Sequence, residues 1–433
     1  MIPEWFIEEV RARIDAAEVF ARHVSLRTSG SSLVGSCPFH EERSPSFRVY
    51  PDEKRYRCYG CGAHGDVFEF AGRIAAKEFP HVVRSFAAEL GLAFPTETGP
   101  EHLDPHRKER AGALAACEAA ASRFAERLGS SEGESARAYL RAAGVGESTI
   151  AKFRLGLASP SWRDVTVELP NVNGLTIEDV ERAGLTVRGR EARLDRFRGR
   201  LMFPCTDHEG RVIGFVGKAL AESSGPPWLV SRPSVLMKLD REFFGMHEAA
   251  GAIRRSTVAV LVGGCEDVLR LHEAGVHNVL APVVGAGLSP EHLPVLVRRG
   301  ARSVVLLGDG LAGMAQGTLA RLAAAFFGSP LSAAVADGGT FIAGRARPVR
   351  RAEVDSALAA ALPFSEFLID EALLRAGVPG GEAGSVEQRL NAAGDLARCV
   401  ALLPAGLPRS TFERRIAQRL RLNLEVLRTA IRP

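Results

Sequence analysis

The sequence predicts a multidomain protein that combines α+β and α/β parts, and three observations support this prediction. A chain of 433 residues is long enough for about two to four domains. From residue 257, short apolar runs alternate with helical stretches, which is typical of a parallel βαβ sheet. Beyond Pro363 the pattern is helical to the end of the chain. We therefore expect a small N-terminal unit, a mixed α/β domain, a parallel sheet and a short C-terminal helical unit.

The composition excludes several classes of protein. Hydrophobic residues make up 46% and charged residues 24%, which is typical of a globular protein and not of a disordered one. No apolar run approaches the roughly 20 residues that cross a bilayer, and the N-terminus has no export signal. Seven cysteines are too few for a disulfide scaffold and favour a reducing cytoplasm. We expect a cytoplasmic protein without a membrane partner.

The first domain is expected to span residues 1–96. The apolar spacing of Phe6, Val10 and Ile14 predicts a helix, and a second helix is predicted at 79–90. Short strands are predicted at 24–26 and 33–34. Residues 97–113 contain proline, glycine and mixed charges without an apolar period, so we interpret them as a linker.

The remaining chain divides into three predicted parts. Residues 114–256 begin with alanine-rich helices and continue with strands at 201–204 and 212–216. Residues 257–345 contain the predicted parallel strands, at 258–262, 279–284, 303–307 and 331–336. Residues 346–433 are helical, and their last 25 residues hold seven arginines against two glutamates. The charge of this run, +5, exceeds the +4 of the whole chain, and we interpret the run as a solvated amphipathic face.

Four residues in the first domain have the spacing of metal ligands. Cys37 and His40 form a C-x2-H pair, and Cys58 and Cys61 form a C-x2-C pair. Three thiolates and one imidazole complete a closed tetrahedral shell, which favours a structural Zn²⁺ over a catalytic one. The sequence therefore predicts a zinc-binding domain.

Aromatic and basic residues are interleaved around these pairs, from Phe39 to Phe70. Basic groups can hold phosphates while aromatic rings stack on unpaired bases, so the pattern is compatible with a nucleic-acid surface. A small zinc domain also needs several of these rings for its own core. Both interpretations remain open from the sequence.

The segment Gly35-Ser36-Cys37-Pro38-Phe39-His40-Glu41-Glu42-Arg43-Ser44-Pro45-Ser46-Phe47, with Tyr56-Arg57-Cys58-Tyr59-Gly60-Cys61-Gly62, resembles the zinc-binding domain of bacterial DnaG-type primases. Residues 195–204 and 210–215 are similar to the start of that family's RNA-polymerase core, and 138–140 and 153–156 to its preceding helices. The resemblance implies a zinc ribbon, a TOPRIM-like parallel sheet, single-stranded DNA as a partner and RNA primer synthesis in replication. The chain ends where the polymerase core would end, so we expect the helicase-binding domain, and with it the usual helicase contact, to be absent.

In this family, acids after the parallel strands hold Mg²⁺ for nucleotidyl transfer. This chain has Gly263-Gly264-Cys265-Glu266-Asp267 where Glu-Gly-x-x-Asp is expected, and Gly308-Asp309-Gly310 where Asp-Gly-Asp is expected. The third cluster is reduced to Asp337. Glu266, Asp267, Asp309 and Asp337 remain as candidate catalytic acids. We therefore expect no normal Mg²⁺ or Mn²⁺ site and an impaired primer synthesis.

Two alternatives stay open. The first is an active primase with a rearranged metal site, which would use nucleoside triphosphates. The second is a dinucleotide-binding protein, because Gly308, Gly310 and Gly313 follow a strand and open a helix, and the next strand ends at Asp337.

The resemblance also identifies four candidate residues for binding DNA or nucleotides. They are Arg198, Arg200, Lys218 and Lys238, which occupy positions similar to the family's template groove. Each could instead be an ordinary surface charge.

Overall fold

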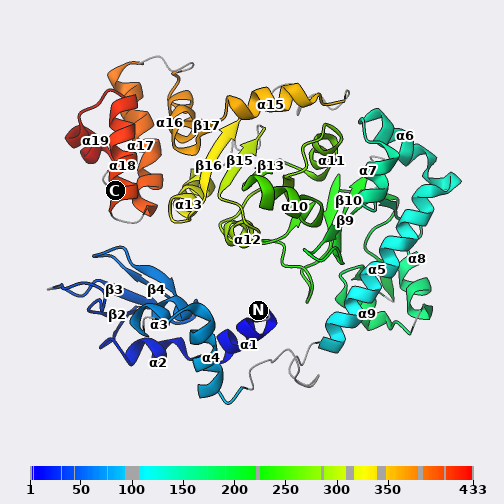
Figure 1. The fold of residues 1–433 in the computed structure, drawn as a ribbon, viewed down its shortest axis with the longest axis horizontal. Helices are drawn as coiled ribbons and strands as arrows, with labels where there is room; N and C mark the ends of the chain where they lie inside the picture. Colours follow the sequence, from blue (N-terminus) through cyan, green and yellow to red (C-terminus); the bar gives the residue numbers. More distant parts are fainter. Residues whose placement is uncertain are drawn as a thin grey trace. The chain divides into compact units, whose positions relative to one another are not determined.

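The computed structural model describes residues 2, 4–30, 32–42, 44–75, 77–92, 107–172, 174–190, 192–220, 225–283, 287–308, 316–338, 348–378, 384–403 and 406–431. Figure 1 shows the course of the chain. The chain divides into two compact units, a first unit of residues 1–107 with 404–412 and a second unit of 108–403 with 413–433. None of the described helices is long and apolar enough to cross a membrane.

The first unit contains an antiparallel sheet of five strands in the order β1-β2-β3-β4-β5. Its strands are β1 (Arg27–Ser29), β2 (Ser32–Gly35), β3 (Phe47–Tyr50), β4 (Arg55–Cys58) and β5 (His64–Asp66). Its helices are α1 (Glu4–Arg13), α2 (Ala16–Ala21), α3 (Val67–Ala75) and α4 (Phe79–Glu89). The helices predicted through Phe6 and at 79–90 are thus confirmed.

The core of the first unit is largely aromatic. Phe20, Phe47, Tyr56 and Phe70 are almost fully buried, and the rings of Phe20 and Phe70 have centroids 4.6 Å apart. The strand predicted at 24–26 is wrong, because the amide of Val24 donates to the Phe20 carbonyl (3.0 Å) and so ends helix α2. The first strand begins only at Arg27.

The second unit begins with helix α5 (Arg107–Gly129), so the end of the predicted linker is helical, while 93–106 lie outside the described residues. Its first sheet has the order β11-β10-β9-β6. These strands are β6 (Gly156–Leu157), β9 (Arg200–Thr206), β10 (Val212–Ala219) and β11 (Trp228–Val230). The short strands β7 (Thr186–Arg188) and β8 (Arg193–Asp195) form a separate hairpin. The helical segments here are α6 (Glu134–Ala142), α7 (Glu147–Lys152), α8 (Asp164–Glu168), α9 (Ile177–Arg182) and the 3₁₀ turns η1 (Ser131–Gly133) and η2 (Leu169–Asn171).

The second sheet of this unit has the order β12-β14-β13-β15-β16-β17. Its central strands β14, β13, β15 and β16 are parallel, as predicted from the βαβ rhythm. The strands are β12 (Phe243–Phe244), β13 (Val258–Leu261), β14 (Val279–Pro282), β15 (Ser303–Leu307), β16 (Ser332–Ala336) and β17 (Leu362–Pro363). The helices between them are α10 (Met246–Ser256), α11 (Cys265–Glu273), α12 (His292–Arg298), α13 (Gln316–Phe327) and α15 (Arg351–Ala359).

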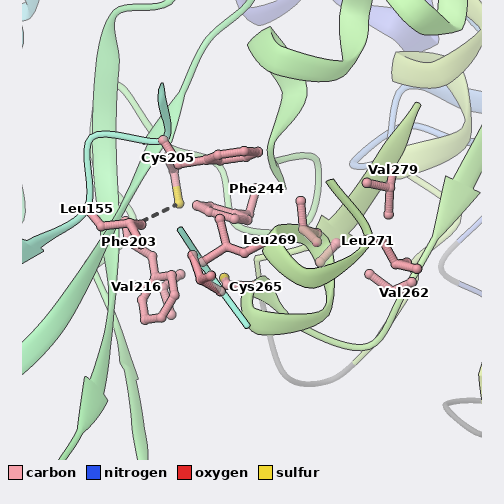
Figure 2. Packing of buried hydrophobic residues seen from close by; sticks show 14 of the residues in the cluster. Leu155, Phe203, Cys205, Val216, Phe244, Val262, Cys265, Leu269, Leu271 and Val279 are labelled. Atoms are coloured by element: carbon pink, nitrogen blue, oxygen red, sulfur yellow. Dashed lines mark hydrogen bonds between the residues drawn. The ribbon is translucent and has the colours of Figure 1, made fainter. Parts of the chain in front are cut away.

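One hydrophobic cluster joins the two sheets of the second unit. Figure 2 shows side chains of β9 and β10, such as Phe203, Cys205 and Val216, together with Cys265 and Leu269 of α11. Cys205 and Cys265 are fully buried, as expected for cysteines that pack as small hydrophobic residues, and burial raises the pKa of both thiols. This packing fixes where helix α11 begins.

The last helices are α16 (Phe364–Arg375), α17 (Val386–Leu402), α18 (Leu407–Arg419) and α19 (Leu424–Ala430). Helix α17 packs against α13, α16 and α19 (Figure 1). Arg414, Arg415, Arg421 and Arg428 of the basic C-terminal run are exposed, as predicted for a solvated face. Arg415 and Arg419 also form ion pairs with Glu366 of α16. Arg428 likewise pairs with the buried Glu413.

Candidate zinc centre and nucleic-acid interface

The four predicted zinc ligands lie together in the first unit. The donor atoms of Cys37, His40, Cys58 and Cys61 all lie within 4.8 Å of one another. The Sγ atoms of Cys37 and Cys61 are 3.8 Å apart, as are Cys58 Sγ and His40 Nδ1. A tetrahedral Zn²⁺ with Zn–S bonds of about 2.3 Å requires sulfurs at about this separation. The donor set and its spacing therefore fit zinc.

Glu42 contacts the histidine ligand of this centre and the backbone of the loop around it. Its Oε2 lies 3.2 Å from His40 Nε2, which leaves Nδ1 of the imidazole facing the cysteines. Its Oε1 accepts the amides of Cys37 (2.7 Å) and Ser46 (3.0 Å). Burial alone would raise the pKa of Glu42, but the hydrogen bonds from Ser46 and Cys37 outweigh it and lower the pKa. A carboxylate on the outer nitrogen of a ligating histidine fixes the tautomer and the ring orientation.

Gly60, between the last two cysteines, is required by close approach. A Cβ at this position would lie 2.6 Å from His40 Nε2 and 2.7 Å from Ser46 Oγ. The backbone can therefore turn around the metal position only because residue 60 has no side chain.

One face of the sheet in the first unit is basic and aromatic. Arg48 and Arg57 are paired across β3 and β4, and the next pair but one, which points to the same face, joins Tyr50 to Arg55. Tyr59 is 55% exposed, donates or accepts a hydrogen bond with Tyr50 (2.9 Å), and has the Arg57 guanidinium 5.2 Å from its ring centroid. The core interpretation is confirmed for Phe47 and Tyr56, which are buried. Tyr50 and Tyr59 lie nearer the surface, where the nucleic-acid interpretation stays a prediction.

In the second unit, the candidate acids Glu266 and Asp267 follow strand β13 on the first turn of α11. Both are buried. Glu266 Oε2 is 3.1 Å from Lys218 Nζ, and its Oε1 accepts the hydroxyl of Tyr139. Asp267 Oδ1 is 3.6 Å from the Arg270 guanidinium, which is buried with it. Both carboxylates are thus engaged by side chains of the protein.

At the positions where the resemblance predicts acids, the described residues offer few ligand atoms for a metal ion. A Cβ at the exposed Gly263 would meet nothing within 4 Å, so no side chain fills that place. Gly308 has φ +110°, which side-chain-bearing residues rarely adopt. Asp309 lies outside the described residues, and Asp337 is exposed just after β16. Within the described ranges, the zinc ligands are the one group of three or more such donors that lie within reach of a common ion. The described donor set does not fit a multi-carboxylate Mg²⁺ site.

The four predicted groove residues have different surroundings. Arg198 precedes β9, is half-buried, and lies 3.7 Å above the ring of Trp162, which is 57% exposed. Arg200 is buried and donates to the carbonyls of Gly217 (3.3 Å) and Pro227 (3.5 Å). Burial lowers the pKa of Arg200. Lys238 is exposed in the loop between β11 and β12.

Lys218 lies on β10, opposite Trp228 of β11. Its ammonium is 4.8 Å from the ring of Trp228 and 5.2 Å from the ring of Tyr139. Burial alone would lower the pKa of Lys218, but the Tyr139 hydroxyl and the Glu266 carboxylate outweigh it and raise the pKa. Lys218 is therefore a charged group held between two rings and one carboxylate.

The dinucleotide interpretation depends on residues that are only partly described. Gly308 and Asp337 directly follow β15 and β16, whereas Gly310 and Gly313 lie outside the described residues. In the strand order β14-β13-β15-β16, the chain passes from β13 to β14 on one side and then to β15 on the other. The topological switch point of the sheet therefore lies between β13 and β15, and the loop after β15 carries the glycines.

Sequence reasoning assigned no role to Glu42, Trp162, Trp228 or Tyr139. Glu42 follows His40 by two residues, so the polar neighbours of the ligand pair were a usable signal. Trp162 and Trp228 are exposed, and exposed tryptophans at basic positions are a typical sign of a binding surface. The contact between Tyr139 and Glu266 joins residues 127 positions apart, and no local pattern indicates it.

Two family models match the chain. Residues 2–102 match the CHC2 zinc finger, and residues 123–250 match the N-terminal domain of the DNA primase catalytic core. The DNA primase of Myxococcus xanthus is 35% identical over 428 residues, which cover 96% of this chain and 68% of that relative. The DNA primases of Halalkalibacterium halodurans and Escherichia coli K12 are 33% and 31% identical, and the chain spans 52% and 53% of their lengths.

Solved structures of similar fold agree with these matches. The Aquifex aeolicus primase, with its zinc-binding and RNA polymerase domains, has a TM-score of 0.58 at 23% identity and 98% coverage of both chains. The RNA polymerase domain of Mycobacterium tuberculosis primase DnaG, solved with a double-stranded DNA oligomer that has a 6-nucleotide overhang, has a TM-score of 0.57 at 28% identity. That match covers 73% of this chain and 99% of the other.

Proposed function

Because this chain belongs to the bacterial DnaG-type DNA primase family, we propose that it binds single-stranded DNA in replication and that its primer synthesis is impaired. The zinc ribbon holds a structural zinc through Cys37, His40, Cys58 and Cys61. The TOPRIM-like sheet keeps its strands but has lost the acids that hold the catalytic metal.

One observation carries the impairment. The two acids that remain after β13 are committed to cations of the protein, Glu266 to Lys218 and Asp267 to Arg270. A metal ion would have to compete with these cations for the carboxylates. The Glu266–Lys218 pair is close, at 3.1 Å, and nearly buried, whereas Asp267 Oδ1 lies 3.6 Å from the Arg270 guanidinium. The glycines at 263 and 308 offer no carboxylate in compensation. Asp309 and Asp337 would be the residual acids of such a site.

Two surfaces support binding of single-stranded DNA. In the first unit, Tyr50 and Tyr59 lie beside Arg48 and Arg57 on the open face of the sheet. In the second unit, Trp162 presents an exposed ring next to Arg198. Exposed rings stack on unpaired bases while guanidinium groups contact phosphates, with little dependence on sequence. Arg200 would act from beneath this surface by holding β9 to β10 and β11, and Lys238 would add an exposed charge.

We also propose substrates, a cellular location and a domain organisation for the protein. Nucleoside triphosphates would be substrates only if primer synthesis persists, and loss of the usual helicase contact remains a prediction. We place the protein in the cytoplasm, where thiolate ligands stay reduced. We divide the chain into a zinc ribbon at 1–96, a linker that ends before helix α5 begins at Arg107, a mixed domain up to residue 256, a TOPRIM-like domain at 257–345 and a helical unit at 346–433.

Titration of a fluorescent single-stranded oligonucleotide at several salt concentrations tests the DNA-binding part of the proposal. We expect the logarithm of the affinity to fall linearly with the logarithm of the salt concentration. Calorimetric titration of the zinc-loaded protein with Mg²⁺ or Mn²⁺ tests the impairment, and we expect no saturable heat. Saturable binding of either ion would instead favour a rearranged metal site.

A further inference from the structure

Glu266 of helix α11 contacts side chains of β10 and α6, which are distant from it in the sequence. Its carboxylate lies between Lys218 of β10, at 3.1 Å, and the hydroxyl of Tyr139 on α6. The side chains of Glu266 and Lys218 are only 8% and 16% exposed. The resulting ion pair is nearly shielded from solvent, so screening by salt is weak there.

The position of Glu266 follows from the packing of its neighbour. Cys265, the first residue of α11, is buried in the cluster with Phe203 and Val216 (Figure 2). Since Cys265 is anchored there, the next side chain on the helix is directed toward β10 and α6. Glu273, at the other end of α11, bonds instead to the amide of Gly146 (2.7 Å). The two glutamates of this helix therefore have separate partners.

The surroundings of Lys218 resemble a site for a phosphate beside a base. The ammonium has Trp228 and Tyr139 on two sides, and Trp228 is 37% exposed. A phosphate could pair with the ammonium while its base stacks on the exposed indole. The Glu266 carboxylate is the anion that occupies the ammonium in the structure.

We propose that Lys218, Trp228 and Tyr139 form a phosphate-binding subsite, and that the carboxylate of Glu266 is an internal competitor which phosphate must displace. This inference depends on the proposed function and deepens it. The phosphate can come from a DNA strand or from a nucleoside triphosphate, because both present the same anionic oxygens.

The substitution Glu266→Gln removes the charge and keeps the shape of the side chain. We expect it to strengthen binding of a dT oligonucleotide by about five- to tenfold at 50 mM salt. We also expect the slope of log affinity against log salt to steepen by about 0.7, which corresponds to one added phosphate contact. The double variant E266Q/K218M should show neither the higher affinity nor the steeper slope, because it has no ammonium for the phosphate to bind.

Glu273→Gln is the matched control, because it neutralises a glutamate on the same helix that does not contact Lys218. Its affinity and slope should equal those of the wild type. If E266Q fails to fold, as judged by circular dichroism, Tyr139→Phe removes one of the two bonds that hold Glu266. This variant should give a smaller gain in the same direction.

Parallel titrations with ATP distinguish the two sources of phosphate. A gain with the oligonucleotide assigns the subsite to the DNA strand, and a gain with ATP alone assigns it to a nucleotide. Equal affinity and slope for E266Q and wild type, with both ligands, would overturn the inference while the wild type still binds DNA. If the wild type shows no salt-dependent DNA binding, the proposed function itself fails.

Discussion

At the scale of single residues, Glu42 has a greater effect on the zinc centre than its position in the sequence suggests. It bonds to His40 and also to two backbone amides of the loop that carries Cys37. The same carboxylate therefore orients a ligand and holds the loop in place.

Glu42→Ala is expected to weaken zinc binding by about 10- to 100-fold, because the imidazole loses its orienting partner. Competition with a chromophoric chelator measures this change. Glu41→Ala removes the exposed neighbouring carboxylate and is the control, with zinc affinity expected to be unchanged. Equal zinc affinity of both variants would contradict the role assigned to Glu42.

The two glycines at the lost acid positions should respond differently to substitution. Gly263→Glu should change the free energy of unfolding by less than about 0.5 kcal/mol, because a Cβ there meets open space. Gly308→Asp should cost about 1–3 kcal/mol, because φ +110° strains any residue with a side chain. Chemical denaturation of the two variants measures the difference. A stable G308D would show that the loop relaxes easily and that the acid could be restored.

Among single residues, the sequence predicted the contacts between residues that are close together in the chain. The zinc ligands were found because two short pairs fix four donors, and the structure brings these four together. The fate of Glu266 could not be predicted, because its partners come from α6 and β10, and only the packed fold brings those elements to it.

At the scale of elements, α5 and α8 are joined by one buried carboxylate. Asp164, the first residue of α8, pairs with Arg123 (2.6 Å) and Arg127 (3.1 Å) of α5. Its side chain is 9% exposed. The hydrogen bond from Arg123, followed by Arg127, lowers the pKa of Asp164 from 3.8 to about 2, although burial opposes this shift.

Asp164→Asn should therefore lower the free energy of unfolding by about 2 kcal/mol at pH 7. Because the folded-state pKa is below the unfolded one, this stabilisation is present above about pH 4 and is lost as the pH falls through about 2. Urea denaturation at pH 7 and pH 3 should show a smaller difference between the proteins at pH 3. Glu134→Gln, on an exposed ion pair, should have little effect at either pH. A difference for D164N that does not change with pH would contradict the assignment.

The surface around Trp162 gives a prediction for the loop that precedes α8. Trp162→Ala should weaken binding of single-stranded DNA by about 1–3 kcal/mol, because a base loses its stacking ring. Fluorescence anisotropy with a labelled oligonucleotide measures the effect. Val167→Ala, at an exposed apolar position of α8, is the control and should bind like the wild type. Unchanged affinity of W162A would remove this loop from the DNA path.

Most elements could be predicted because their patterns are strong. The parallel strands are continuous apolar runs, and the sheet has them as expected. The segment 24–26 was mistaken for a strand because Val24 is apolar, but this residue ends a helix and fills the core. Most of the C-terminal arginines that the structure describes are exposed, as their spacing predicts. The carboxylate partner of Arg415 and Arg419 on α16 could not be predicted, because only the fold brings it near.

At the scale of the whole molecule, the chain has the architecture of its family, and we propose that its metal-binding loop is altered. The zinc ribbon and the core that match the primase models depend on apolar spacing and on cysteine pairs, and both are present in the sequence. The proposed catalytic site depends on a few acids, and the resemblance predicts that glycines occupy their places. Fold and chemistry can therefore separate, because different residues determine them.

We propose that this primase-family protein binds its template but has an impaired metal site for primer synthesis. RNA primer synthesis on single-stranded DNA tests this directly, with Mg²⁺ or Mn²⁺ and radiolabelled nucleoside triphosphates, using a preparation that binds the same template. We expect template binding with no template-dependent RNA product, or only a trace. Robust, template-dependent primers with either ion would contradict it and would establish an active primase with a rearranged metal site.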